Sequence, residues 1–415
     1  MTTRERLSVS RTWSAWSCTV RLTVDDPAVL GAACGALKAL MDRVDKAASR
    51  FRPDSELAAV NTRAGSMVPG SRLLVDLVDV SLVAASISGG AVDPTVGAAV
   101  VAAGYDKDIA AVRSRRPQTA GSPVPATCWQ TVQLNRKLAM VGVPKGTLLD
   151  LGAIAKAWTA DRAALVLSKR HGCAVLVEIG GDLRAAGTPA EAWVIGVAER
   201  EGDPVAKVTL SHGGLTTSTR IARRWATHKG DAHHIIDPRT GEPADGPWRT
   251  ASVWAPSAVR ANTFSTALVA TGEAALGRLT LAGHPARLVA DDGEITELAG
   301  RPTATRPPDD ALVLGPRGRG DGDGPLHNRC LARSARCRQP QTRAAVLAAV
   351  RPPLSRCHRP AAPGRPRDRS NHRQLCRHQR RRPGVAVRFR IAPVRGDARR
   401  AGYVRPGARR SGRSR

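Results

Sequence analysis

The sequence predicts an α+β fold over residues 1–300, in which helices pack on mixed and antiparallel sheets. Three observations support this prediction. Apolar residues recur at helical spacing in several segments, and short runs of β-branched or alternating residues lie between them. Residues 1–300 also have the ordinary composition of a soluble protein, and they are long enough to bury a sizeable core in one large or two smaller domains.

The first part of the chain alternates between strand and helix patterns. Thr19–Val24 has period-two alternation, which predicts a strand. Asp25-Asp26-Pro27 is a typical helix start, and an apolar stripe continues to about Ala48. The segment 52–57 predicts a turn that caps a short helix ending near Asn61. Residues 72–88 predict a second long apolar helix, followed by Gly89-Gly90.

The second part predicts more strands. Residues 106–127 are polar and rich in proline, so we expect a surface loop there. Helices are expected at about 152–170 and about 262–282. Strands and hairpins are expected at 129–134 with 138–141, at 173–179, 193–198, 206–210 and 251–255, and at 287–289 with 295–298 around a turn at 291–293.

Residues 301–415 differ in composition from the rest. They hold 30 arginines and six aspartates but no lysine or glutamate, and so carry +24 of the net charge of +29. Such a charge suggests nucleic-acid binding through phosphates, which we disfavour because the tail has no repeat and only Phe389 and Tyr403 as aromatic residues. Our hypothesis is that the chain from roughly residue 308 is a frameshifted or otherwise non-native extension. We expect this low-complexity tail to be disordered.

Cysteine spacing and hydropathy indicate the compartment. The eight cysteines form no Cys-x-x-Cys pair, so a zinc site in the tail is disfavoured. Cys18, Cys34, Cys128 and Cys173 are expected to be reduced and mostly buried. Neither a secretory signal nor a run of 18 apolar residues is found, so we expect a cytoplasmic protein without a membrane span.

The run from His233 to Gly241 is the strongest candidate for a site. It joins two histidines, an apolar pair and the turn Asp237-Pro238-Arg239-Thr240-Gly241. Histidine carries protons near neutral pH, and proline and glycine hold such a turn in one shape. A strand that delivers a histidine to a rigid acidic turn is typical of a built site. The alternative is a histidine at a strand end beside an ordinary turn.

Four further segments have both a functional and a purely structural interpretation. Gly89–Thr95 predicts either a backbone that approaches a ligand closely or a helix C-cap with a tight turn. Asp150–Ala157 predicts either phosphate binding at a helix start or a simple N-cap. Glu178–Asp182 is a glycine-containing strand end or a plain turn. Ala261–Leu268 places Asn262, Ser265 and Thr266 on one helix face, as oxygen ligands for a hard cation or with Asn262 as a cap.

Taken in order, these segments resemble the FAD:protein FMN transferase (ApbE) family. The resemblance covers about residues 13–298 and includes Phe51–Leu57 with Asn61, Ala91–Gly97, Asp150–Asp161, Ile179–Asp182 and His234–Gly241. It implies an ApbE-like fold and an enzyme that uses Mg²⁺ to move FMN from FAD to a Thr or Ser hydroxyl of a target flavoprotein, with release of AMP.

The resemblance also implies roles for individual residues. His234 matches a proposed base for the acceptor hydroxyl. The positions that match the FAD site are Phe51, Ala91, Val92, Asp93, Asp150, Lys156 and Ile235. The positions that match the metal site are Ala153, through its carbonyl, Asn262, Ser265 and Thr266.

The chain departs from the family pattern at several of these positions. Asn262 stands where the family usually has Asp, which removes a negative ligand and should weaken Mg²⁺ binding. Ala157 replaces a usual Gly, Val92 a usual Phe, and Trp16-Ser17-Cys18 a Met-Gly-Thr-like segment. These changes indicate an actinobacterial-type branch or a degraded copy. The alternative functions are therefore a non-catalytic FAD-binding or storage protein of the same fold, and nucleic-acid binding through the tail.

Overall fold

The computed structural model describes residues 8–200, 203 and 205–299, and the backbone of a strand at 388–392. Its centre is an eight-stranded sheet in which every neighbouring pair is antiparallel. The order along the sheet is β1 (Val9–Ala15), β2 (Cys18–Val24), β6 (Val175–Ile179), β7 (Asp182–Ala186), β10 (Gly213–Thr219), β13 (Trp248–Ala255), β14 (Ala286–Ala290) and β15 (Ile295–Leu298).

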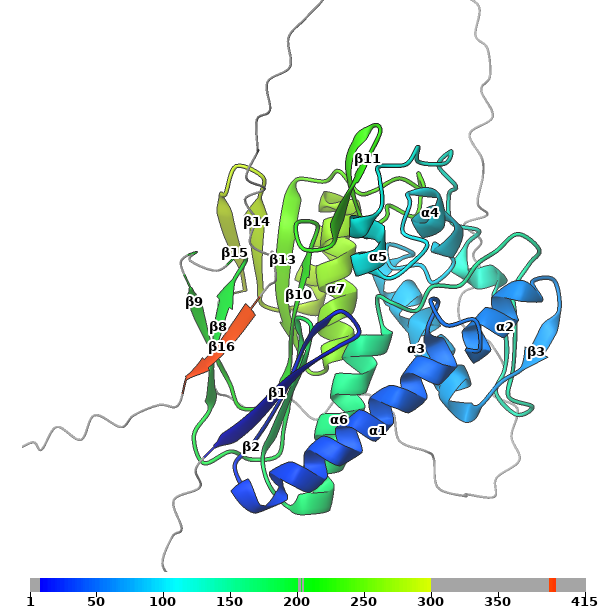
Figure 1. Cartoon of the computed structure of the whole chain (residues 1–415). Helices are drawn as coiled ribbons and strands as arrows, with labels where there is room; N and C mark the ends of the chain where they lie inside the picture. Colours follow the sequence, from blue (N-terminus) through cyan, green and yellow to red (C-terminus); the bar gives the residue numbers. More distant parts are fainter. Residues whose placement is uncertain (1–7, 201–202, 204, 300–387, 393–415) are drawn as a thin grey trace, which may run out of the picture. The chain divides into compact units, whose positions relative to one another are not determined.

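Three long helices cover one face of this sheet (Figure 1). They are α1 (Leu30–Ala48), which follows the 3-10 turn Pro27–Val29, α6 (Ala155–His171) and α7 (Ala258–Thr271). Val175, Val177 and Ile179 of β6 face the helices, because alternate residues of a strand point to the same side. Leu176 lies in a separate core on the other face, which explains why all of β6 is buried.

That second core is closed by a small sheet of β8 (Trp193–Ala198) and β9 (Ala206–Leu210), with the backbone of β16 (Arg388–Ala392) paired to β8. The predicted strands 193–198 and 206–210 are confirmed at both ends. Apart from β16, the tail lies outside the described residues, so its predicted disorder and frameshift origin stay predictions.

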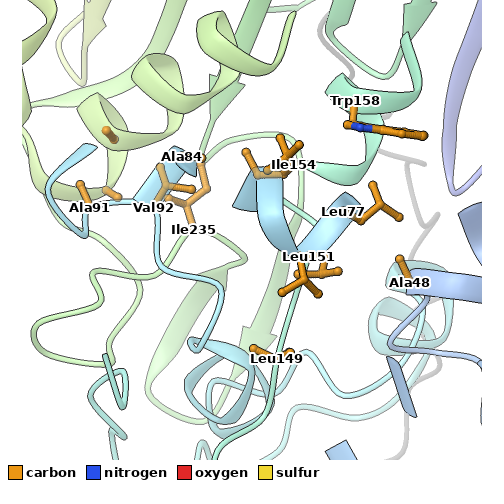
Figure 2. Close-up of a cluster of buried hydrophobic side chains, with 14 of the residues drawn as sticks. Ala48, Leu77, Ala84, Ala91, Val92, Leu149, Leu151, Ile154, Trp158 and Ile235 are labelled. Atoms are coloured by element: carbon orange, nitrogen blue, oxygen red, sulfur yellow. The ribbon is translucent and has the colours of Figure 1, made fainter. Parts of the chain in front are cut away.

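A helical region packs beside the main layers. It contains α2 (Glu56–Thr62), α3 (Arg72–Ser88), α8 (Glu273–Ala282) and a three-stranded sheet of β3 (Met67–Pro69), β5 (Met140–Gly142) and β4 (Gln133–Asn135). Its apolar cluster brings together Leu77 of α3, Ile154 before α6, and Ile235 from the histidine run (Figure 2). The cluster therefore joins segments that are far apart in the sequence.

A smaller hydrophobic cluster packs four further elements together. It holds α4 (Gly97–Ala102), α5 (Ile109–Ser114), β11 (Arg224–Thr227) and β12 (Gly230–His233), and the Tyr105 and Trp225 rings stack at its centre, 5.2 Å apart. Strand β12 ends at His233, so the prediction of a strand that delivers histidine to the turn is confirmed.

Several expectations were wrong in detail. The expected loop at 106–127 contains α5, which Asp108 caps by accepting a bond from Ala110 N. The expected helix 262–282 is two helices, α7 and α8, which Gly272 separates with a φ of 58°. Period-two alternation did not identify strands β1, β7 and β10. Strands β7 and β10 are buried on both faces, so they lack the alternation of a half-exposed strand.

Of the structural interpretations of the four candidate segments, two are wrong and two are confirmed. Ser257 caps α7, so the prediction that Asn262 caps it is wrong. Ile154 is the residue before α6, so the N-cap prediction for Asp150 is wrong too. Gly89 is a left-handed C-cap of α3, and Gly180-Gly181 form a two-residue hairpin turn with φ values of 57° and 96°, as predicted.

Two expectations drawn from composition can also be compared with the structure. The four cysteines in the described region form no disulfide there; Cys34 and Cys173 are buried, whereas Cys18 and Cys128 are half-buried. Within the described residues, no helix has both the length and the apolar character needed to cross a bilayer.

Candidate functional site

A cavity of about 590 Å³ opens where the glycine hairpin of β6 and β7 meets α6, α7 and the histidine run. Such a volume is within the range of small-molecule sites. Eleven of the twelve residues predicted for the site line it: Phe51, Ala91, Val92, Asp93, Asp150, Ala153, Lys156, His234, Ile235, Asn262 and Thr266. Segments separated by up to two hundred residues therefore meet at one place.

Ser265 is the predicted site residue that does not line the cavity. Its side chain is fully buried against β10, where its hydroxyl lies 2.8 Å from Ser218 Oγ and 3.2 Å from Thr216 Oγ1. The helical spacing that puts Asn262 and Thr266 at the cavity turns Ser265 toward the sheet.

One end of the cavity is aromatic. The Phe51 ring is 41% exposed and lies 5.4 Å from the Tyr105 ring. The Arg50 guanidinium lies 4.5 Å from the Phe51 ring, and its Nε is 2.8 Å from Asp150 Oδ2. A flat, partly exposed ring backed by a paired cation is suited to stacking on a planar ligand.

The turn at Asp93–Thr95 holds the backbone of Ala91 and Val92 at the cavity. Asp93 Oδ1 accepts bonds from Thr95 N and Oγ1, at 2.8 and 2.7 Å, and Asp93 Oδ2 accepts one from Trp129 N at 3.0 Å. The carboxylate is therefore occupied in shaping the loop, and Ala91 and Val92 present small apolar groups to the cavity.

The other end of the cavity is a connected polar network. Lys156 Nζ is ion-paired with Asp182 Oδ2, and Asn262 Nδ2 donates to Asp182 Oδ1 at 2.7 Å. Thr266 Oγ1 donates to Asn262 Oδ1 at 3.2 Å and lies 2.9 Å from Ser218 Oγ. Asp182 is 1% exposed, so the ammonium and the amide satisfy a carboxylate that water cannot reach.

This network is a candidate site for a hard cation. Asn262 and Thr266 line the cavity together with Ala153, and both side chains carry an oxygen, the ligand type that Mg²⁺ prefers. The donor set fits a hard cation in chemistry but is neutral, because both oxygens of Asp182 are bonded to other groups. Among the described residues, no three acidic, histidine or cysteine side chains cluster as metal ligands. A cation at this site would therefore need a negatively charged bound molecule as a further ligand.

His234 differs from its neighbour His233. His233 Nε2 is hydrogen-bonded to Ala244 O at 3.0 Å, and burial lowers the pKa of His233 to about 4. His234 lines the cavity and is bonded to the backbone of Arg223, and its Nδ1 has no hydrogen-bond partner in the described part of the chain. Burial first, then the charge of Arg223, lowers the pKa of His234 well below its usual value. The imidazole is therefore neutral at pH 7.

The structure adds cavity residues that sequence reasoning missed. Tyr105 and Arg50 build the aromatic end, and Ser218 and Arg223 line the polar end. None of these residues lies in a segment with a recognisable pattern. Trp16 and Ser17 also line the cavity, at the tip of the β1–β2 hairpin, with left-handed φ values of 51° and 55°. Non-glycine residues rarely adopt such values.

Glu178 lies beside this end of the cavity as a buried carboxyl. Burial raises the pKa of Glu178 to about 7, against the opposing effect of Arg21, whose Nη1 is 3.8 Å from Glu178 Oε2. The two acids near Gly180-Gly181 therefore differ in their partners. Both carboxylate oxygens of Asp182 are bonded, whereas Glu178 has only a long ion pair with Arg21.

Comparison with known proteins identifies the family. A relative named FAD:protein FMN transferase from Treponema pallidum is 31% identical over 277 residues, which cover 61% of this chain and 76% of that protein. One of the same name from Klebsiella pneumoniae is 27% identical over 246 residues, covering 57% and 70%.

Solved structures agree on the fold. The ApbE protein from Thermotoga maritima has a TM-score of 0.62 at 25% identity, over 70% of this chain and 97% of that one. The apo flavinyl transferase ApbE from Pseudomonas stutzeri has a TM-score of 0.56 at 24% identity, over 72% and 97%. The model of the ApbE family matches residues 14–286. The chain therefore belongs to the ApbE family, whose curated members in this comparison are flavinyltransferase enzymes.

Proposed function

We propose that this protein transfers FMN from FAD to a Thr or Ser hydroxyl of a target flavoprotein, in a Mg²⁺-dependent reaction that releases AMP. Family membership and the relatives' names support flavinyl transfer. The observation that carries the proposal is the cavity itself, which joins an aromatic end, a buried cationic network and a neutral histidine.

Binding follows from the two ends of the cavity. A planar ring of FAD would stack on Phe51, with Ala91, Val92 and Ile235 as apolar contacts. The diphosphate would lie toward Lys156 and the first turn of α6. That turn has no side-chain cap, and the N–H groups of Ile154 and Ala155 donate to Leu151 O, so an anion would meet the N–H groups that follow them. Asp150 supports this arrangement through Arg50 and by accepting a bond from Gly152 N at 2.7 Å.

The transfer step needs positioning and charge neutralisation more than covalent help from the enzyme. The acceptor hydroxyl oxygen attacks the phosphorus of the FMN half, and a new P–O ester bond forms. The P–O bond to the bridging oxygen breaks, and AMP leaves with that oxygen. The hydroxyl proton goes to His234, which is neutral and has an acceptor nitrogen free of protein partners in the described residues.

We propose that Mg²⁺ is held by the carbonyl of Ala153 and the side-chain oxygens of Asn262 and Thr266. When bound, it supplies Lewis-acid neutralisation at the diphosphate. Because the protein donors are neutral, the phosphate oxygens would supply the negative charge, as is common for Mg²⁺ sites. Ser265 would support Asn262 and Ser218 from behind, through its bonds to both.

The test is acceptor-dependent release of AMP. The full chain is incubated with FAD, Mg²⁺ and a flavoprotein domain that carries the target Thr, and AMP and the intact mass of the domain are measured. We expect AMP and an FMN adduct in equal amounts, and neither with a Thr→Ala domain. Bound FAD without AMP or adduct would contradict transfer and favour the storage alternative.

A further inference from the structure

The cavity is lined by cations, and the described residues already engage most of them. Arg50 and Lys156 are paired with Asp150 and Asp182. Arg52 is paired with Asp45 and Asp54, and Arg113 donates to the carbonyls of Ala222 and Arg224 at 2.5 and 3.0 Å. Among the described residues, Arg113 and Arg223 are the lining cations that pair with no carboxylate, and Arg223 makes fewer hydrogen bonds.

Arg223 has no carboxylate within ion-pair distance in the described part of the chain. It is half-buried between β10 and β11, and its Nη2 donates to Trp16 O at 3.3 Å. The nearby carboxylate of Asp108 is engaged elsewhere, because Oδ1 accepts from Ala110 N at 2.9 Å and Oδ2 from the Ser17 hydroxyl. A guanidinium at a cavity with most of its donors free is arranged for an anionic ligand.

The position of Arg223 is set by the hairpin tip. Trp16 and Ser17 both have left-handed backbone, and this turn directs the Trp16 carbonyl at Arg223 and the Ser17 hydroxyl at Asp108. Uncommon backbone of this kind persists where the surroundings enforce it, often at functional sites. The hairpin therefore holds the guanidinium from one side and binds Asp108, which stays beyond ion-pair distance of Arg223. Against the effect of burial, the hydrogen bonds to Asp108 and then the charge of Arg223 nevertheless lower the pKa of Asp108.

Arg223 lies near both Tyr105 and the polar end of the cavity, because its charge, after burial, acts on the pKa of Tyr105 as well as on that of His234. Its charge and that of Lys156 both lower the pKa of His234, after the larger effect of burial. The backbone of Arg223 also holds the His234 ring. Arg223, the paired lysine and the neutral histidine therefore share one region of the cavity.

We infer that Arg223 binds the diphosphate of the dinucleotide and neutralises the phosphoryl oxygens during transfer. The inference rests on the proposed function for the identity of the ligand. A planar guanidinium can contact two phosphate oxygens at once, which a lysine cannot do. Arg223 forms no covalent bond and exchanges no proton in this role. It supplies positive charge next to a magnesium site whose protein ligands are neutral.

The experiment compares FAD with riboflavin, which has the same flavin ring but no phosphate. Dissociation constants are measured by fluorescence for the full chain, for Arg223→Ala and for Arg224→Ala. Arg224 is the matched control, because it is exposed, lies outside the cavity lining and pairs with Asp231 at 3.3 Å. The basic tail is present in every variant, so its contribution to phosphate binding cancels.

We expect Arg223→Ala to weaken FAD binding about 10- to 100-fold and to change riboflavin binding less than twofold. Arg224→Ala should change neither. Unchanged FAD binding in Arg223→Ala, or equal losses for FAD and riboflavin, would overturn the inference. A wild-type chain that binds FAD with this discrimination but forms no FMN adduct would remove the proposed transfer and keep the phosphate site.

Inorganic pyrophosphate gives a second readout without the flavin. Isothermal titration should show binding to wild type and Arg224→Ala at equal affinity, and at least tenfold weaker binding to Arg223→Ala. If Arg223→Ala fails to fold, Arg223→Gln carries the same comparison. Arg223→Lys should recover only part of the affinity, since a lysine keeps the charge but loses the two-oxygen contact. Equal pyrophosphate affinity in all variants would contradict the inference.

Discussion

The two ends of the cavity are held by different interactions. At the aromatic end, Phe51 is 41% exposed and lies against Tyr105 and a paired arginine, so that end can adapt to a flat ligand. At the polar end, Asp182 and Asn262 are almost fully buried and are joined by hydrogen bonds and an ion pair. Changes at the aromatic end should therefore affect binding alone, whereas changes at the polar end should affect chemistry and stability together.

The largest effect should come from the proton acceptor. His234→Gln should slow transfer about 10²- to 10⁴-fold, because general-base catalysis contributes roughly that much. The dissociation constant for FAD should change less than about threefold. Single-turnover adduct formation by mass spectrometry checks this. His233→Gln is the control, since His233 bonds to Ala244 O and lies outside the cavity lining. An undiminished rate in His234→Gln would exclude His234 from the mechanism.

The ion pair at the polar end should matter for both stability and binding. Lys156→Met leaves the buried carboxylate of Asp182 without its cation, and we expect the free energy of unfolding to fall by about 3 kcal/mol. FAD affinity should fall as well. The double variant Lys156→Met with Asp182→Asn should regain most of the stability but none of the affinity. Recovery of FAD binding in the double variant would show that Lys156 only balances Asp182.

Buried and half-buried histidines make stability depend on pH, and they include His234, whose pKa burial lowers well below its usual value. Burial lowers the pKa of His233 and of His284 to about 4, from an unfolded value near 6.5. Below pH 6.5 the unfolded chain therefore binds protons that the folded chain does not. The contribution of these histidines to the free energy of unfolding should fall between pH 6.5 and 4, by roughly 1–3 kcal/mol per histidine, whereas the raised pKa of Glu178 contributes a slope of opposite sign.

Urea unfolding at several pH values measures this dependence. His284→Gln should reduce the histidine part of this slope relative to the wild type, because it removes one of the three histidines whose pKa burial lowers. An unchanged slope would mean that His284 is protonated in the folded protein.

Asn262 tests the neutral metal site. Asn262→Asp would place a second carboxylate beside Asp182, where the amide now lies 2.7 Å from Oδ1. A cation would relieve the repulsion, so we expect the Mg²⁺ concentration for half-maximal transfer to fall about tenfold. Thr266→Ala should shift the midpoint in the opposite direction. A Mg²⁺ titration that neither substitution alters would contradict the proposed ligands.

The smallest effect belongs to the aromatic end. Phe51→Ala should raise KM for FAD about three- to tenfold and leave kcat nearly unchanged, because a partly exposed ring pair contributes about 1 kcal/mol. Phe51→Tyr should behave like the wild type. Steady-state kinetics distinguishes the two variants, and a large loss in kcat for Phe51→Ala would show that the two ends are coupled.

The sequence was sufficient where local pattern and structure coincide. The helix 72–88 and the strands 193–198 and 206–210 are where they were expected. Eleven of the twelve predicted site residues line one cavity, and their roles stay predictions. Ser265 could not be placed, since helical spacing puts Asn262, Ser265 and Thr266 on one face without deciding which side of that face meets the sheet. Packing of α7 on β10 decides it.

Other features depend on distant contacts. The neighbouring glycines mark Asp182 as part of a candidate segment in the sequence. Its pairing with Lys156 and Asn262 cannot be read from the sequence, because these residues meet only in the folded chain. Arg223 and Tyr105 lie in unpatterned segments, and nothing local marks them as cavity residues. Strands β7 and β10 are buried on both faces, so the alternation that identifies a half-exposed strand is absent.

The most direct test of the two-ended cavity is a crystal structure of the full chain with FAD and Mg²⁺. The account predicts a planar ring of FAD on Phe51 and Tyr105, with the diphosphate against Lys156, Arg223 and the first turn of α6. A diphosphate at the aromatic end, or FAD bound outside this cavity, would contradict the account.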